Sequence, residues 1–428
     1  MYNYADAFYQ ASLTAAVSRH NVEKELDRME AGAATAGTAT GGTTAGTAVG
    51  GSAIAVTTAG AGMAAGGAAT AGKAAGWTAA ANNPVGAAAC AASYADTDAA
   101  LARWRSDLSC DFLSCLGGSP WQCPLNIQRG EQKRLTASAF GEIAYSGGGP
   151  SKREYTRERI VFEAEAGLLT PAYLLVPDGA DESTPVIIAL EGHGFGVADI
   201  VGLNPDGTEQ APGESGYQKA FAVGLAQRGF VVIAPELMGF GELRLERDIK
   251  PDNPRDSSCN AISSMLLMIG RTMAGVRVNQ ARRCIDALAS LGYRQNPMMM
   301  GISGGGLVCA YTAALDERVR ACCVSGFANT YRGCFLAMHH CVDCFQPGLL
   351  LTADMPDILS LIAPRPMIWE SGEDDPIFPI ADVLEAERIV RRVYKAYGKD
   401  GDFVLDRFPA DHQIHGVVSY DFLWKYAV

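Results

Sequence analysis

Short, mostly apolar runs alternate with helical stretches from about residue 159 onward, and this alternation constrains the fold more than any other feature. Runs with apolar residues at nearly every position are typical of β-strands that are covered on both faces, as in parallel sheets. We expect strands at about 159–162, 172–176, 185–190, 230–234, 298–300, 320–324, 366–370 and 403–405, and helices at about 217–227, 263–291, 307–315 and 417–426. The alternation predicts a mostly parallel sheet with helices on both faces, in which sites form beyond the carboxyl ends of the strands.

A glycine-rich segment, Gly301–Gly305 with the sequence GISGG, lies at one of these strand ends and is followed by an expected helix. The pattern G-x-S-x-G between a strand and a helix is typical of a serine on a very sharp turn, where the residues two positions away must be small. The start of the following helix favours a negative charge that develops nearby. We therefore predict that Ser303 is a nucleophile; the alternative is an ordinary glycine-rich turn.

The base that such a serine needs must be one of only six histidines. His412 lies in the loop between the last expected strand and the last expected helix, from where an imidazole could reach back over the sheet. His415 lies in the same loop and is the rival, and either residue could be a solvated loop histidine. We favour His412 because of its position after the strand.

The acid that orients this imidazole is expected in the loop after the strand at 366–370, where Glu373, Asp374 and Asp375 follow one another. A carboxylate there would hold the histidine tautomer and stabilise the imidazolium. We favour Asp375, because the proline that follows it fixes the loop, and keep Asp374 as the alternative.

Two backbone N–H groups are candidates for an oxyanion hole, which stabilises the carbonyl oxygen as it gains charge. Gly304 follows the proposed nucleophile directly, and His193 lies in a glycine-rich loop after the strand expected at 185–190. We assign the N–H groups of His193 and Gly304 to this role; the alternative for the His193 loop is a plain glycine-rich turn.

Together these motifs resemble the α/β-hydrolase superfamily, and within it the dienelactone-hydrolase and acetyl-xylan-esterase-like branch of bacterial hydrolases. The resemblance covers about residues 159–428 and rests on Gly301–Gly306, Ala363–Pro366, Gly372–Pro379 and Asp411–His412, with further likeness at 235–242 and 269–275. It implies an α/β-hydrolase fold and a Ser-His-Asp triad of Ser303, His412 and Asp375 that hydrolyses carboxylic esters.

One departure from the family pattern concerns the oxyanion loop, which commonly begins His-Gly in such proteins and here begins Glu191-Gly192. A carboxylate near a developing oxyanion would repel it unless the side chain points away. This departure, together with an insertion foreign to the pattern, is the main support for a non-catalytic binding protein on the same fold.

That insertion is a segment of biased composition near the N-terminus. From Ala31 to Gly76 every residue is Ala, Gly or Thr except Val49, Ser52, Ile54, Val56, Met63 and Lys73. Such a segment has almost no large side chains to bury, so we expect it to be disordered. The chain then divides into a helical arm at 1–30, a low-complexity segment at 31–97, the rest of the arm with a connector at 98–158, and a catalytic domain at 159–428.

Composition excludes some functions and sets the expected location. The net charge of −12 argues against a nucleic-acid partner, which would need clustered positive charge. No run of 18 strongly apolar residues appears, so we expect no membrane span. Because the first residues lack the layout of a secretory signal, we interpret the twelve cysteines as reduced thiols of a cytoplasmic protein. The sequence leaves a homo-oligomer open.

One cluster of metal-binding residue types lies at 339–344, with the sequence HHCVDC. Two histidines and two cysteines suit zinc, but zinc sites usually draw ligand pairs from separated parts of a chain, and no second pair stands out. We expect instead a loop that borders the active site, and no metal or cofactor.

The sequence as a whole predicts a serine hydrolase, acetyl-esterase-like, that cleaves a small-molecule carboxylic ester through an acyl-enzyme. The alternatives are hydrolysis of a peptide, thioester or lactone bond, or ligand binding without catalysis.

Overall fold

The computed structural model describes residues 21–28, 99–118, 120, 122–136, 153–211, 216–250 and 253–427. The predicted disordered segment at 31–97 and most of the first half of the helical arm lie outside these residues. Within them, residues 22–28 are helical, and the backbone N–H of Val22 donates a hydrogen bond to Asp357 at 2.7 Å.

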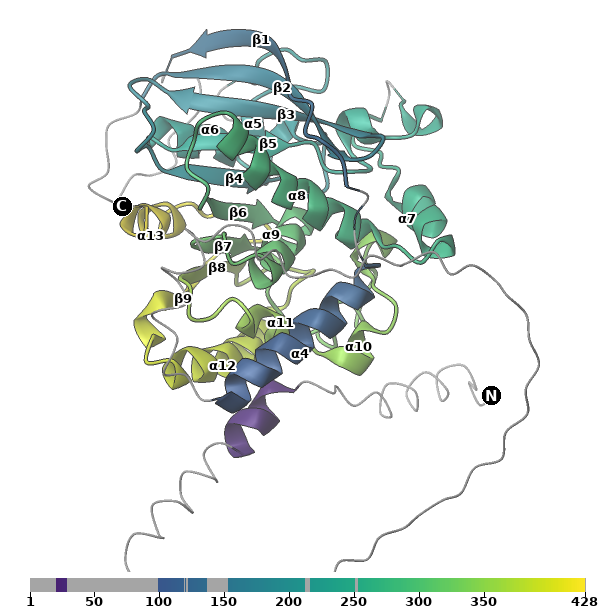
Figure 1. Cartoon of the computed structure of the whole chain (residues 1–428), viewed down its shortest axis with the longest axis vertical. Helices are drawn as coiled ribbons and strands as arrows, with labels where there is room; N and C mark the ends of the chain where they lie inside the picture. The colour runs from purple at the N-terminus through teal and green to yellow at the C-terminus, as the bar shows by residue number, and fades with distance from the viewer. Residues whose placement is uncertain are drawn as a thin grey trace, which may run out of the picture. The chain divides into compact units, whose positions relative to one another are not determined.

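The described residues build a nine-stranded sheet with the strand order β1-β2-β3-β5-β4-β6-β7-β8-β9 (Figure 1). The strands are β1 (Gln128–Leu135), β2 (Tyr155–Glu165), β3 (Leu168–Pro177), β4 (Val186–Leu190), β5 (Val231–Pro235), β6 (Met298–Ile302), β7 (Cys322–Ser325), β8 (Met367–Gly372) and β9 (Phe403–Phe408). The first three pairings, β1-β2, β2-β3 and β3-β5, are antiparallel, and the other five are parallel. The predicted mostly parallel sheet is confirmed.

The first strand lies in a stretch that we expected to be a connector. β1 is not apolar: its sequence is QRGEQKRL, and seven of its eight residues are exposed. A strand at the edge of a sheet pairs through its backbone on one side only, so it needs no apolar face, and charged side chains are common there. The hydrophobic pattern therefore carries no signal for β1, and it also places the start of β2 four residues late.

Helices cover both faces of the sheet, as predicted. They are α4 (Ala99–Cys115), α5 (Ala198–Val201), α6 (Phe221–Gln227), α7 (Cys259–Met268), α8 (Met273–Ser290), α9 (Gly304–Leu315), α10 (Leu349–Thr352), α11 (Met355–Ser360), α12 (Ile380–Ala396) and α13 (Ser419–Lys425). Side chains of α5, α6 and α13 form one buried cluster with alternate residues of β4 to β8, such as Ile187 and Met300. The other face contacts α8, α9 and α12.

The helix predicted from the spacing of apolar residues after residue 98 is confirmed as α4. Its apolar positions are all buried: Leu101, Trp104, Leu108, Phe112 and Leu116 are at most 6% exposed. α4 lies across α9, where the rings of Phe112 and Tyr311 meet edge to face at 4.8 Å between centroids (Figure 1). The helix stops at Gly117 and Gly118, which both have positive φ.

The prediction of a single long helix at 263–291 is wrong. Two helices, α7 and α8, meet there at an angle of 100°. Gly270 has a φ of 72°, and the Thr272 side chain caps α8 by accepting a hydrogen bond from the N–H of Gly275 at 3.0 Å. A left-handed glycine and a threonine cap end one helix and start another, although the apolar pattern runs through both.

In the described part of the chain, no single helix is both long enough and apolar enough to cross a membrane; α7 and α8 meet these criteria only together, as a bent pair.

Candidate active site

Ser303 lies on a sharp turn between β6 and α9 and has a strained backbone, with φ 58° and ψ −121°. Two glycines make the turn sterically feasible. A Cβ on Gly301 would lie 2.2 Å from the backbone oxygen of Gly305, and a Cβ on Gly305 would lie 2.1 Å from the backbone oxygen of Leu190. The structure therefore places Ser303 where the motif predicted it, at the carboxyl end of a central strand.

His412 and Asp375 are brought together from the loops after β9 and β8. Nδ1 of His412 lies 2.7 Å from Oδ2 of Asp375, whose side chain is 2% exposed. The other carboxylate oxygen accepts hydrogen bonds from the N–H groups of Ile377 and Phe378, at 2.9 and 3.1 Å, which fix its orientation. Asp374, the alternative acid, is exposed to solvent.

The His412 imidazole lies beside the segment that holds the backbone of Ser303. The N–H of Ser303 donates to the carbonyl of Ser325 at the end of β7, at 3.0 Å. The next residue, Gly326, touches the imidazole: a Cβ there would lie 2.7 Å from Cε1 of His412. Nε2 of His412 is buried and has no hydrogen-bond partner among the described residues. The three predicted side chains thus lie at the same edge of the sheet.

His415, the rival base, forms a second histidine–carboxylate pair. Its Nδ1 lies 2.7 Å from Oδ2 of Asp406 on β9, and its ring stacks on Phe408. Glu370 of β8 holds the backbone of this loop by accepting hydrogen bonds from the N–H groups of His415 and Gly416 at 3.2 and 2.7 Å. These contacts support the loop that carries His412 and give His415 a structural role.

The loop after β4, which carries His193, packs against the Ser303 turn. A Cβ on Gly192 would lie 3.0 Å from Cβ of Ser303, and a Cβ on Gly304 would lie 3.3 Å from Nδ1 of His193. The N–H of Gly192 donates to the Gln218 side chain at 2.8 Å, whereas no described residue accepts a hydrogen bond from the N–H of His193. The two residues predicted for the oxyanion hole are therefore neighbours.

Tyr217 also lies at the site, although the sequence analysis did not predict a role for it. Its ring stacks on His412 at 5.5 Å between centroids, and Phe378 stacks on the same imidazole at 5.7 Å. Its hydroxyl donates a 2.7 Å hydrogen bond to the carbonyl of His193. Burial raises the pKa of Tyr217, so the hydroxyl stays protonated and remains a donor. Tyr217 therefore connects the base to the loop of the oxyanion hole.

Glu191, the departure from the family pattern, points away from the oxyanion hole. Its side chain is fully buried and accepts a hydrogen bond from the N–H of Leu237, after β5, at 2.7 Å. Burial raises the pKa of Glu191 well above its ordinary value, and the neighbouring Glu236 raises it further. The carboxyl group thus faces the end of β5 and not the His193 N–H, where the oxyanion is predicted.

Glu236 binds the backbone of the loop that follows β4. Its carboxylate accepts hydrogen bonds from the N–H groups of Val197 and Glu242 at 2.9 and 3.3 Å. Burial raises the pKa of Glu236 to about 7, although these two N–H groups lower it. The residue therefore titrates near neutral pH inside the protein.

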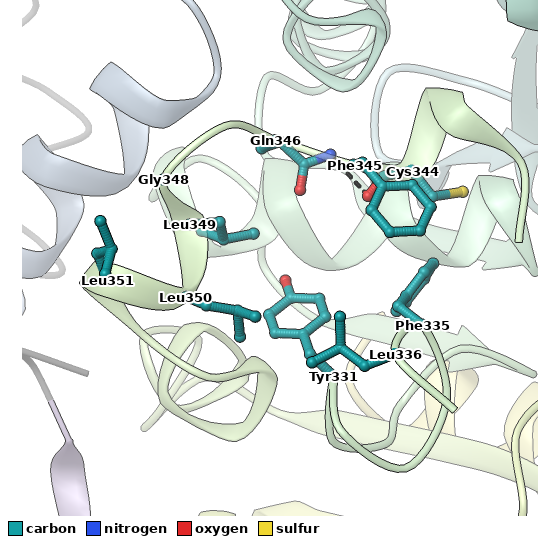
Figure 2. A pocket seen from close by; sticks show the side chains of 10 residues that line it. All are labelled: Tyr331, Phe335, Leu336, Cys344, Phe345, Gln346, Gly348, Leu349, Leu350 and Leu351. Carbon is teal, nitrogen blue, oxygen red and sulfur yellow. Dashed lines mark hydrogen bonds between the residues drawn. The ribbon is translucent and has the colours of Figure 1, made fainter. Parts of the chain in front are cut away.

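An apolar pocket of about 290 Å³ lies among the residues that follow β7 (Figure 2). It is lined by Tyr331, Phe335, Leu336, Cys344, Phe345, Gln346, Gly348, Leu349, Leu350 and Leu351. Phe335 packs against Phe378 at 6.1 Å between centroids, and Phe378 stacks on His412. A chain of ring contacts through Phe335 and Phe378 therefore connects the pocket wall to the imidazole.

Comparison with known proteins agrees with this architecture. A crystal structure described as a putative acetyl xylan esterase from Bacteroides fragilis superposes with a TM-score of 0.56 at 15% identity, covering 72% of this chain and 75% of that one. A glucuronoyl esterase from Solibacter usitatus gives 0.54 at 16% identity, covering 77% and 93%. The chain has the α/β-hydrolase fold.

The chain also has a relative that is detected by sequence comparison. The Bacillus subtilis (strain 168) protein named "Putative hydrolase YtaP" is 24% identical over 277 residues, which are 63% of this chain and 87% of that protein. No family model matches the chain.

The close approach at the Ser303 turn predicts a steric effect on stability. We expect Gly305→Ala to lower the free energy of unfolding by about 1–3 kcal/mol or more, because the added methyl group meets backbone rather than a movable side chain. Gly401→Ala is the matched control, since a Cβ there meets nothing within 4 Å. Urea unfolding measures both variants, and equal stability of the two would contradict the steric argument.

The raised pKa of Glu236 predicts a pH dependence of stability. Between its ordinary value of 4.5 and about 7, the folded chain keeps a proton that the unfolded chain releases, so the free energy of unfolding falls as pH rises through this window. The difference corresponds to at most about 3 kcal/mol. Glu236→Gln should flatten this part of the profile, measured by urea unfolding from pH 4 to 8.

The exposed Glu246 provides the control for this measurement, because it is not among the groups that shift the pKa of Glu236, so Glu246→Gln should keep the wild-type slope. A Glu236→Gln profile as steep as that of the wild type would show that other groups cause the pH dependence.

Proposed function

We propose that the protein is a serine hydrolase that cleaves a carboxylic ester through a Ser-His-Asp triad of Ser303, His412 and Asp375. The observation that carries the proposal is the 2.7 Å contact between His412 and buried Asp375, at the edge of the sheet where Ser303 lies on its strained turn. Nε2 of His412 has no hydrogen-bond partner among the described residues, Ser303 included, so a base position is open on this nitrogen. A serine held in such a turn has its hydroxyl presented at the top of the sheet, where a base can take its proton.

In the proposed reaction, Oγ of Ser303 attacks the ester carbon while Nε2 of His412 takes the hydroxyl proton. The carbonyl oxygen becomes an oxyanion that accepts hydrogen bonds from the N–H groups of His193 and Gly304. His412 gives its proton to the departing alcohol, which leaves an acyl-enzyme on Ser303. Water, deprotonated by His412, then releases the acid and restores the serine. Asp375 holds the imidazole tautomer throughout and stabilises the imidazolium.

The expected substrate is a small acyl ester, with acetyl as the first choice. The names of the two structural neighbours, an acetyl xylan esterase and a glucuronoyl esterase, both denote ester hydrolysis. Peptide, thioester and lactone bonds remain the alternatives for the same catalytic residues.

The expectation of a cytoplasmic protein with a small-molecule substrate also stays a proposal. Every cysteine within the described residues is a free thiol, which is consistent with a reducing compartment.

The triad assignment predicts different results for two neighbouring carboxylates. Asp375→Asn should lower kcat for p-nitrophenyl acetate by about 10³- to 10⁴-fold, because the amide favours the wrong imidazole tautomer. Asp374→Asn is the matched control: the same substitution one residue away, on an exposed side chain, should leave kcat within about twofold. Equal effects of both substitutions would contradict the assignment of Asp375.

A fluorophosphonate probe distinguishes catalysis from binding alone. It should label the wild-type chain at Ser303, found by peptide mass mapping, and should not label Ser303→Ala. A folded wild-type protein that stays unlabelled and hydrolyses no ester would favour a non-catalytic binding protein on this fold.

Tyr217 is expected to position the oxyanion loop. Tyr217→Phe keeps the ring on His412 but removes the donor to the His193 carbonyl, so kcat should fall about 2- to 10-fold with little change in KM, as expected for one neutral hydrogen bond. Tyr426→Phe is the control, because it removes a hydroxyl bonded to Asp402 on the far side of the domain. An unchanged kcat in Tyr217→Phe would contradict the positioning role.

A further inference from the structure

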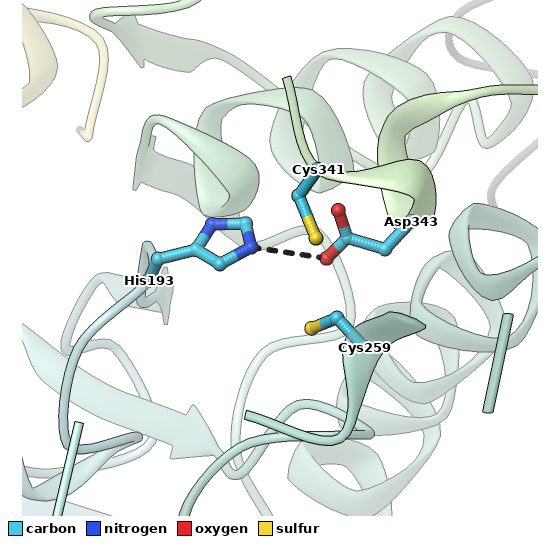
Figure 3. A group of neighbouring side chains, drawn as sticks. All are labelled: His193, Cys259, Cys341 and Asp343. Atoms are coloured by element: carbon cyan, nitrogen blue, oxygen red, sulfur yellow. Dashed lines mark ion pairs between the residues drawn. The ribbon is translucent and has the colours of Figure 1, made fainter. Parts of the chain in front are cut away.

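Four side chains that bind transition metals meet beside the oxyanion loop, from three separated parts of the chain (Figure 3). His193 comes from the loop after β4, Cys259 is the first residue of α7, and Cys341 and Asp343 lie at the short 3₁₀ helix η3 (Val342–Cys344). One ligand atom from each lies within 4.8 Å of the ligand atoms of all the others. The motif at 339–344 has no second pair of ligands nearby in the sequence. His193 and Cys259, which are more than 80 positions away, supply that pair.

We propose that His193, Cys259, Cys341 and Asp343 form a zinc site with one imidazole, two thiolate and one carboxylate ligand. Tetrahedral zinc with ligands at about 2.0–2.3 Å requires ligand atoms about 3.3–3.8 Å apart. Nε2 of His193 already lies 3.3 Å from Oδ2 of Asp343, so small rotations of the side chains complete the geometry.

The chemistry of the ligands selects zinc over the hard cations. Calcium and magnesium prefer sets made only of oxygen atoms, whereas thiolate and imidazole ligands suit zinc. Four protein ligands fill a tetrahedral site and leave no open position, which is the arrangement of structural zinc. We therefore assign the metal a structural role, separate from the chemistry at Ser303.

Charge and proton balance are consistent with a divalent ion. Zn²⁺ bound by two thiolates, one carboxylate and one neutral imidazole has a net charge of −1, which the positive charge of Arg277 offsets, and the protons that the ligands lose go to solvent. His193 binds as the neutral imidazole, through Nε2, with its proton on Nδ1. No oxidant or reductant is needed.

A buried arginine next to the cluster orients two of the ligands. Arg277 is 2% exposed; its guanidinium donates to Oδ2 of Asp343 at 2.5 Å and to Sγ of Cys259 at 3.1 Å. Hydrogen bonds from such outer groups fix ligand orientation and compensate negative charge in metal sites. Nε2 of His193 is buried and has no hydrogen-bond partner among the described residues, and Asp343 is fully buried.

Bound zinc would tie the loop of the oxyanion hole to α7 and η3. His193 is both the proposed ligand, through its side chain, and the proposed oxyanion donor, through its backbone N–H. This consequence rests on the proposed function, whereas the metal site itself does not, because metal content is measured independently of ester hydrolysis.

The test is the zinc content of the full chain, purified without chelator and measured by mass spectrometry of the metal. We expect about one zinc per chain in the wild type and in the control Cys110→Ser, an exposed cysteine outside the cluster. Cys341→Ser should bind zinc at least about tenfold more weakly, since a lost ligand weakens binding no less than a lost outer group does. A protein that binds zinc but hydrolyses no ester would refute the proposed function and leave this site standing.

The cobalt(II) spectrum of the wild type keeps the test independent of how well the variant folds, because it reports thiolate ligands directly. Cobalt added to the metal-free wild type should give sulfur-to-cobalt charge-transfer bands, and these should weaken in Cys341→Ser. The proposal is overturned if zinc and cobalt neither bind nor raise the unfolding temperature of the wild type. It is also overturned if Cys341→Ser binds both metals as the wild type does, or if Cys259 and Cys341 are found joined as a disulfide in the purified protein.

Discussion

The site depends on the close approach of two backbones, at the point where the turn after β6 passes the end of β4. Gly305 lies so near the carbonyl of Leu190 that no side chain fits between them. This contact lets α9 begin directly over the sheet and turns Ser303 outward. It also brings the loop after β4 within reach of the same serine, because that loop starts at the residue after Leu190.

The other residues of the site lie on loops that come directly after neighbouring strands. β7, β8 and β9 follow β6 in this order across the parallel part of the sheet, so the loops that hold Gly326, Asp375 and His412 leave the same edge. Asp375 orients the imidazole through one nitrogen, and the rings of Tyr217 and Phe378 both stack on it. Further along the same loop, two backbone N–H groups donate hydrogen bonds to the Glu370 carboxylate. These contacts together fix the orientation of the His412 ring.

The sequence predicted those parts of the site that depend on order along the chain and on strand ends. Ser303 and Asp375 follow the fully buried strands β6 and β8, which have a clear hydrophobic signature, and His412 follows the partly buried β9, which starts with the apolar run Phe403 to Leu405. The sequence did not reveal β1, whose residues are polar because the strand lies at an edge, nor the break between α7 and α8, where the apolar pattern is continuous. Tyr217 and Cys259 were missed because their roles arise from contacts between distant loops, which leave no local pattern.

The edge formed by β1 has a consequence for how copies of this chain can associate. Its exposed side chains include Arg129, Glu131, Lys133 and Arg134, and its register shifts between Arg129 and Gln132. If a strand from another molecule paired with β1, several charged side chains would lose contact with water. The new strand would also have to match the irregular hydrogen-bond register of β1. Any homo-oligomer of this protein would therefore be built through other surfaces, and the sheet would end at β1 in every copy.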